Sequence, residues 1–297
     1  MQRMMRVTAA AMTCLWGASQ QVAAMGMSLD DVVPNFFGVG VGVTTQWYGA
    51  SDSMVGAMPG ARLAMSEGRF VEWYGPYADA NLIRDDHWEA GPVLNVRLGR
   101  SDVDDPVVAT LPEIGMGLEG GGYVGWHYLQ TSGIPYRVRA GVMATTSMVG
   151  QTEGSSLSPF ASVWVPLSYT LFVGLGAGAS WSNAAYMQQS FSVSEADAAV
   201  SGLEQFEADA GWRQIYFWPA VMWRVSDRWM LGSAIFGQRL LGDAANSPIV
   251  SERGDRDQQE EMASDAHGGS FQSVRSREAP GLLRRTTRAW RGYRRPP

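Results

Sequence analysis

The chain has 297 residues, of which 35 are glycine and 45% are hydrophobic, and this composition excludes a wholly disordered protein. Its formal net charge is −6, and every basic residue is an arginine because the sequence contains no lysine. The only cysteine is Cys14. A chain cleaved after residue 24 would therefore have no cysteine for a disulfide, a thiolate metal site or a cysteine nucleophile.

The first 24 residues have the pattern of a Sec signal peptide. Arg3 and Arg6 precede an apolar run over residues 7–16, and the small residues Ala23 and Ala24 fit a cleavage site. The alternative is an N-terminal membrane anchor, but the run is shorter than the ~20 residues that a spanning helix needs. The sequence therefore predicts export and cleavage after Ala24.

Stretches with a period of two follow, which is the pattern of β-strands rather than of helices. In residues 36–48, Phe37, Val39 and Val41 fall on one face, and glycine or polar residues fall on the other. The same alternation occurs in residues 92–99, 117–128, 136–146 and 169–182, and less regular strands are expected at 55–66, 69–75, 159–168, 214–225 and 228–239.

The second face of several of these strands is charged or polar. Its residues include Arg97, Glu119, His127, Arg137 and Arg139, which do not make a globular core. A secreted β-sandwich would turn this face to water, and a transmembrane barrel would turn it to the lumen. The signal peptide, the lack of cysteine and the aromatic residues near strand ends favour an all-β fold, an antiparallel up-and-down transmembrane β-barrel.

The positions of the short turns bear on the number of strands. Bacterial barrels keep both chain ends in the periplasm, so short turns should follow even-numbered strands. The turns at residues 67–68, 167–168 and 226–227 follow the second, seventh and ninth of the ten strands. One strand is therefore missing from the count, within residues 77–83 or 103–114. A twelfth strand, needed for closure, would have to follow Asp257.

Several stretches carry a resemblance to a known family. They are the Gly-Val strand that runs into residues 47–52, residues 81–94, residues 185–194 and, most specifically, 240-LLGDAANSPIVSERGDRDQ-258. Over residues 36–258 the chain resembles the MltA-interacting protein (MipA)/OmpV family of Gram-negative outer-membrane proteins. The resemblance implies an outer-membrane β-barrel of about twelve strands in its intact form, surrounded by outer-membrane lipid.

The resemblance also implies a function. The founding member of the family is described as a scaffold that links a lytic transglycosylase to a murein synthase, and other members are treated as porin-like or adhesion proteins. The first expectation is therefore a non-enzymatic scaffold for peptidoglycan-remodelling enzymes, with those enzymes as partners and no nucleic acid. The alternative is a small-solute channel.

The end of the chain departs from the family pattern. The resemblance implies one last amphipathic strand, but residues 259–297 do not alternate, and residues 275–297 hold 8 Arg against the single Glu278. We expect a barrel domain over residues 25–258, an Arg-rich disordered tail over residues 259–297 and therefore a missing last strand. A shifted reading frame is one explanation, and a genuine tail that binds acidic lipid headgroups or nucleic acid is the other.

The candidate lumen-lining residues are Arg97, Glu119, His127, Arg137 and Arg139. They could select for anionic solutes. The favoured alternative is a packed network of ion pairs that fills a narrow barrel, because long side chains leave little free space inside twelve strands.

Two motifs match the sequence patterns of other kinds of site, but they lack the structural context that those sites require. Residues 115–120 match a dinucleotide-binding fingerprint, but they run into a strand and not into a helix. Asp85, Asp86 and His87 could serve hydrolysis, but adjacent residues of an extended chain point in opposite directions. The histidines lack the spacing of metal ligands. No catalytic, cofactor-binding or metal-binding residue is predicted.

Overall fold

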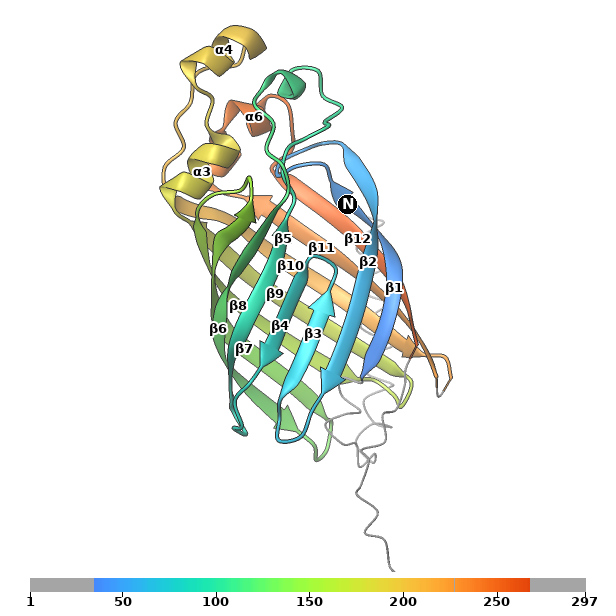
Figure 1. Ribbon diagram of the computed structural model, residues 1–297. Coiled ribbons are helices and arrows are strands. Elements are labelled where there is room, and N and C mark those ends of the chain that lie inside the picture. The colour runs from blue at the N-terminus through green and yellow to red at the C-terminus, as the bar shows by residue number, and fades with distance from the viewer. Residues whose placement is uncertain (1–34, 227, 268–297) are drawn as a thin grey trace, which may run out of the picture.

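The computed structural model describes residues 35–226 and 228–267, which form one closed antiparallel barrel (Figure 1). Each strand pairs with the strands before and after it in the sequence, and the last pairs with the first, so the barrel is of the predicted up-and-down type. The strands are β1 Phe36–Thr45, β2 Ser53–Ala64, β3 Phe70–Tyr74, β4 Tyr77–Asn81, β5 Trp88–Arg97, β6 Gly117–Gln130, β7 Tyr136–Gly150, β8 Ser155–Pro166, β9 Leu171–Ser182, β10 Gly211–Arg224, β11 Trp229–Leu240 and β12 Asp257–His267.

The outer face of the barrel wall is apolar and the inner face carries charge. Along β1, the side chains of Phe37 and Val41 are 68% and 63% exposed, whereas Glu89 and Arg97 on β5 are 1% and 2% exposed. A soluble protein would bury the first pair and expose the second. The distribution is that of a transmembrane barrel, in which lipid contacts the apolar face.

A short hairpin supplies the strand that the turn count requires. Strands β3 and β4 have five residues each, and they are joined at Gly75 and Pro76. The backbone angle φ of Gly75 is +57°, a conformation that favours glycine in a tight turn. Strand β4 lies in the first of the two predicted ranges, residues 77–83. The second range, residues 103–114, is a loop with one short 3-10 helix, η1 Val108–Thr110.

The expectation that the last strand is missing is wrong. Strand β12 begins at Asp257 and extends past the predicted domain boundary at Gln258; it pairs with β11 on one side and with β1 on the other. The sequence does not reveal this strand because residues 257–267 do not alternate between apolar and polar residues. Without β12, the edges of β1 and β11 would have backbone groups without hydrogen-bond partners, so a strand is favoured there whatever its hydropathy. Residues 268–297 and the predicted signal peptide lie outside the described residues.

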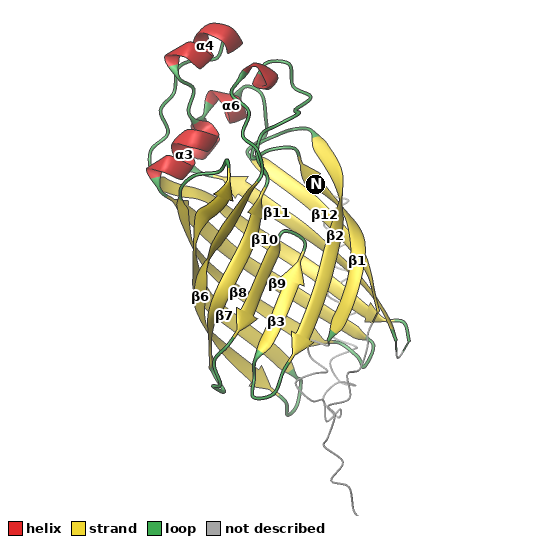
Figure 2. Ribbon diagram, in the orientation of Figure 1, coloured by secondary structure: helices red, strands yellow, loops and turns green. Residues whose placement is uncertain are grey.

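The two ends of the barrel differ (Figure 2). Short turns after the even-numbered strands form one end, which we name the turn end. The other end carries the long loops and the helices α3 Ala184–Phe191, α4 Glu195–Ser201, α5 Gly242–Asn246 and α6 Pro248–Ser251. In residues 35–226 and 228–267, none of the helices has both the length and the apolar composition to span a membrane.

The long loops pack into a layer over the barrel mouth, which we name the cap. Its apolar core includes Trp47 after β1, Val108 after β5, Phe191 on α3 and Ile249 on α6. Arg253 joins two of these loops by donating from Nη2 to Asp105 Oδ2 at 2.7 Å. The loop between β9 and β10, which contains α3 and α4, therefore belongs to a packed structure. The same cap contains residues 240–256 of the most specific family motif.

Candidate functional site inside the barrel

The inner face of the wall from β2 to β7 carries a group of charged side chains that we name the interior network. Each of the six strands contributes to it. The members are Arg62, Glu72, Asp79, Glu89, His127, Arg137 and Arg139. Alternation along each strand places these side chains inward, because neighbouring residues of a strand point to opposite faces of the sheet.

Arg139 on β7 is the centre of the interior network. Its guanidinium contacts three carboxylates that come from three different strands. Nε lies 2.7 Å from Glu89 Oε2 and Nη1 lies 3.3 Å from Glu72 Oε2, while Nη2 lies 3.4 Å from Asp79 Oδ2. One side chain thus connects β7 to β3, β4 and β5 across the barrel interior.

The remaining members complete the pairing. Arg62 Nε donates to Glu72 Oε1 at 2.9 Å, and Arg137 Nη2 donates to Glu89 Oε1 at 2.8 Å. His127 Nδ1 lies 3.0 Å from the same oxygen of Glu89. The three guanidiniums also lie within 5.1–5.5 Å of the centre of the Phe70 ring.

The charges of the interior network balance. Three arginines face three carboxylates, and each carboxylate has at least one arginine within 3.4 Å. Buried charges are tolerated when they are paired and hydrogen-bonded in this way. Arginine does not give up its proton in proteins, so these three groups do not act as bases. The arrangement is a network of paired charges that connects the inner faces of β2 to β7.

The wall opposite the network is aromatic and carries hydroxyl groups. Trp164 and Trp218 pack with their ring centres 5.9 Å apart, and the hydroxyls of Ser158 and Ser180 are 2.9 Å apart. Toward the turn end, Phe172 and Met230 belong to a buried apolar cluster between the strands. The two walls of the interior therefore differ in chemistry.

The five predicted lumen-lining residues all lie inside the barrel, but in two groups. Arg137, Arg139 and His127 belong to the interior network. Arg97 and Glu119 lie closer to the cap, where Arg97 Nη1 is 3.8 Å from Glu119 Oε1. Both side chains are buried.

Sequence reasoning missed the carboxylate half of the network. Glu72 lies in a predicted strand but was not singled out, and Asp79 lies in the strand that only the turn count detected. Glu89 precedes the predicted start of its strand at residue 92, because Gly91 and Pro92 interrupt the alternation. A charged residue between two apolar residues of a strand was the pattern that could have identified them. Glu72, between Val71 and Trp73, is an example.

The other motifs form no site of their own. The Asp85 carboxylate accepts hydrogen bonds from the backbone N–H groups of His87 and Trp88, both at 2.9 Å, which stabilises a turn between β4 and β5. These two hydrogen bonds lower the pKa of Asp85, and their effect outweighs that of burial, which acts in the opposite direction. The glycine motif continues into β6. Within the described chain, no cluster of three or more His, Cys, Asp and Glu side chains could hold a metal ion.

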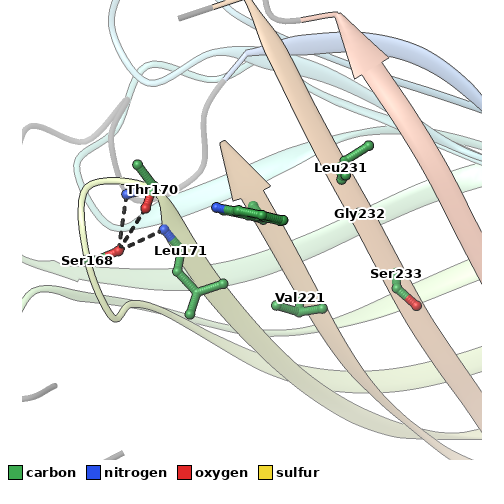
Figure 3. A pocket seen from close by; sticks show the side chains of 8 residues that line it. Ser168, Thr170, Leu171, Val221, Leu231, Gly232 and Ser233 are labelled. Carbon is green, nitrogen blue, oxygen red and sulfur yellow. Dashed lines mark hydrogen bonds between the residues drawn. The ribbon is translucent and has the colours of Figure 1, made fainter. Parts of the chain in front are cut away.

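A groove of about 430 Å³ lies on the outer surface near the turn end (Figure 3). Val221, Trp223 and Leu231 line it from the lipid-facing side of β10 and β11. Ser168, in the turn after β8, closes one end and hydrogen-bonds Thr170 and Leu171. The groove is separate from the interior network because its strand side chains point outward.

Comparisons with known proteins identify the family of the chain. Residues 37–262 match the family model described as "MltA-interacting protein MipA". A solved structure titled "CymD monoaromatic hydrocarbon channel" matches with 10% identity and a TM-score of 0.30, covering 84% of this chain and 95% of that chain, a similarity too low to carry an argument. No curated protein matches. Because the family model spans most of the chain, the chain belongs to the MltA-interacting protein MipA family.

Proposed function

We propose that this chain is an outer-membrane protein that serves as a scaffold for peptidoglycan-remodelling enzymes, with a lytic transglycosylase and a murein synthase as partners. The family name, which refers to interaction with MltA, supports the choice of a lytic transglycosylase as a partner. The observation that carries the proposal is the interior network, which spans β2 to β7 with paired charges beneath a packed cap. A barrel braced in this way suits a rigid anchor better than a wide pore.

The proposal places the turn end in the periplasm, where murein enzymes act. Barrels of this type have short periplasmic turns and longer loops outside. The turns after β2 and β4 are joined by an ion pair of 2.7 Å between Arg84 Nε and Glu67 Oε2. Their exposed polar side chains give a partner enzyme a surface that does not enter the membrane.

A binding assay with site-directed blocking tests this proposal. Thr131→Cys at the turn end and Val200→Cys on the cap, both in a Cys14→Ser chain, would be coupled separately to a bulky maleimide polymer. We expect the turn-end polymer to reduce capture of a purified lytic transglycosylase at least about tenfold, and the cap polymer to leave capture unchanged. If the unmodified barrel captures neither the lytic transglycosylase nor a purified murein synthase, the scaffold function is contradicted.

One observation favours the alternative of a small-solute channel. The wall opposite the interior network has aromatic side chains that are only half-buried, which indicates space along that side of the interior. They are Trp164, Trp218 and Phe236. A channel predicts single-channel conductance in planar bilayers, whereas the scaffold predicts none. Anion preference that disappears in Arg137→Ser would assign the conductance to the interior network.

A further inference from the structure

A second group of arginines lies between the cap and the barrel, and its charge is not balanced. Arg97 at the end of β5, Arg100 just beyond it and Arg213 on β10 are all at least nine-tenths buried. The guanidinium carbons of Arg97 and Arg213 lie 3.5 Å and 4.6 Å from the centre of the same ring, that of Tyr186 on α3. Three strand or loop positions thus bring positive charge to one helix.

The same helix receives the hydrogen bonds of these arginines. Arg97 Nη2 donates to Ser190 Oγ, and Arg100 Nη1 donates to the Ser190 backbone oxygen at 3.3 Å. Arg213 Nη1 donates to the Tyr186 hydroxyl at 2.6 Å. Most of their partners are neutral oxygens, which satisfy donors but do not cancel charge.

Carboxylates near this group are too few. Glu119 pairs with Arg97 at the long distance of 3.8 Å, and its second oxygen accepts a hydrogen bond from Asn95. Asp197 attracts Arg100, but its carboxylate is already held by Ser194 in the capping box of α4. Burial lowers the pKa of Arg100 to about 10, in keeping with a cation that lacks a close counter-charge. The interior network, by contrast, has one carboxylate for each arginine.

A small cavity lies at the unbalanced charge. It has a volume of about 20 Å³ and is lined in part by Arg97, Arg100, Tyr48 and Ser190. The Nε group of Arg100 is buried and has no hydrogen-bond acceptor within the described structure. Roughly 10–15 Å³ is needed for one water-sized sphere, so the cavity has room for one such particle and not for a phosphate, sulfate or carboxylate group.

We propose that this cavity binds one monatomic anion, of which chloride is the common example, and that the anion holds the cap to the barrel. A negative ion beside Arg97 and Arg100 reduces the uncompensated charge that makes their burial costly. Arg100, whose Nε has no hydrogen-bond acceptor in the described structure, is one of the residues that line the cavity. The inference is independent of the proposed scaffold function, because it concerns closure of the cap.

The test measures opening of the cap by limited proteolysis of the full-length barrel in detergent. Sodium chloride would be compared with sodium gluconate at equal ionic strength, since gluconate is too large for the cavity. A ligand that binds only the closed cap suppresses opening by a factor of one plus its concentration divided by its Kd. We therefore expect cleavage within residues 202–209 to slow about tenfold when chloride reaches ten times its Kd.

Matched variants locate the effect. Arg100→Gln should abolish the difference between the two salts, and Arg239→Gln, an exposed arginine on the outer wall, should keep it. Equal cleavage in both salts for the unaltered protein would overturn the proposal, and so would a chloride effect that persists in Arg100→Gln.

A direct measurement of chloride binding tests the proposal even if the Arg100→Gln variant does not fold. The chloride-35 NMR signal should broaden in the presence of the unaltered barrel and narrow again when bromide is added, because bromide competes for the cavity. No broadening, or broadening that bromide does not reverse, would show that the cavity does not bind the ion.

Discussion

Arg139 shows how a single side chain can hold several strands of a barrel. It is the one arginine of the described interior network that contacts Glu72, Asp79 and Glu89 together. Removing its charge would leave three buried carboxylates with only Arg62, Arg137 and His127 nearby. The cost of such a change lies mainly in the charges that remain without a partner.

We expect Arg139→Met, which keeps much of the side-chain length, to destabilise the barrel by about 3–5 kcal/mol. The measurement is urea-induced unfolding in lipid bilayers. Arg239→Met is the matched control, because Arg239 and Asp257 form an exposed pair at 3.6 Å, and exposed pairs contribute less than about 1 kcal/mol. Equal effects of the two variants would show that the interior network does not brace the barrel.

We expect the Asp105–Arg253 pair to make closure of the cap depend on pH. Burial works against ionisation of Asp105, but the hydrogen bonds from Arg253 and from the N–H groups of Val107 and Val108 are together stronger and lower its pKa. A carboxyl whose pKa is lower in the folded state stabilises that state above its unfolded pKa, and this contribution disappears as the pH falls through the folded value.

We therefore expect the cap to become sensitive to protease as the pH falls below about 4, the ordinary pKa of aspartate. Asp105→Asn should be protease-sensitive already at neutral pH and should show a smaller step on acidification. Asp86→Asn, at the turn end, should behave like the unaltered protein. An unchanged acid step in Asp105→Asn would assign the step to other groups.

Among the elements, the strands were predictable where their outer face is continuously apolar. The first, sixth and ninth strands alternate over ten or more residues, and their predicted ranges overlap the observed ones. Strand β4 is too short for alternation to identify, and only the spacing of the turns indicated it. Strand β12 was missed because pairing on both edges determines it more than hydropathy does.

The cap was predictable only as loops, since its core joins residues from four loops that are distant in the sequence. The close approach of two of these loops depends on Gly254 of the family motif. A Cβ atom at Gly254 would lie 1.8 Å from the backbone oxygen of Gly49, and Asp255 N donates to that oxygen at 2.8 Å. The motif is therefore specific for a structural reason that sequence alone did not reveal.

Gly254→Ala should force the two loops apart and destabilise the cap by about 1–3 kcal/mol, the usual cost of overpacking. The readout is the rate of cap cleavage by protease, with Gly211→Ala as the control, because a Cβ at Gly211 meets no atom within 4 Å. If the Gly254→Ala barrel is cleaved at the unaltered rate, the contact between these loops is not needed for closure.

On the scale of the whole molecule, a single seam between β1 and β12 turns the sheet into a barrel. The register places Val41 opposite Ala263. A disulfide requires Cα atoms within about 7 Å, a condition that cross-strand partners meet.

In a Cys14→Ser chain, we expect Val41→Cys with Ala263→Cys to form a disulfide under mild oxidation. The cross-linked chain should migrate faster than its reduced form in a denaturing gel. Val41→Cys with Ala266→Cys is the control, because Ala266 pairs with Gly38 and lies three positions away along β12. Efficient cross-linking of the control, or none of the first pair, would contradict the observed closure.

This seam also has a consequence for the order of folding. Every other strand pairing joins neighbours in the sequence, so it can form locally as soon as one hairpin is made. Among the strand pairings, only that of β1 with β12 joins strands from opposite ends of the described chain, and it carries the loop-closure entropy of the whole sheet. We therefore expect the hairpins to form one after another into an open sheet. Pairing of β1 with β12 should then be the slowest step and should limit the rate of folding.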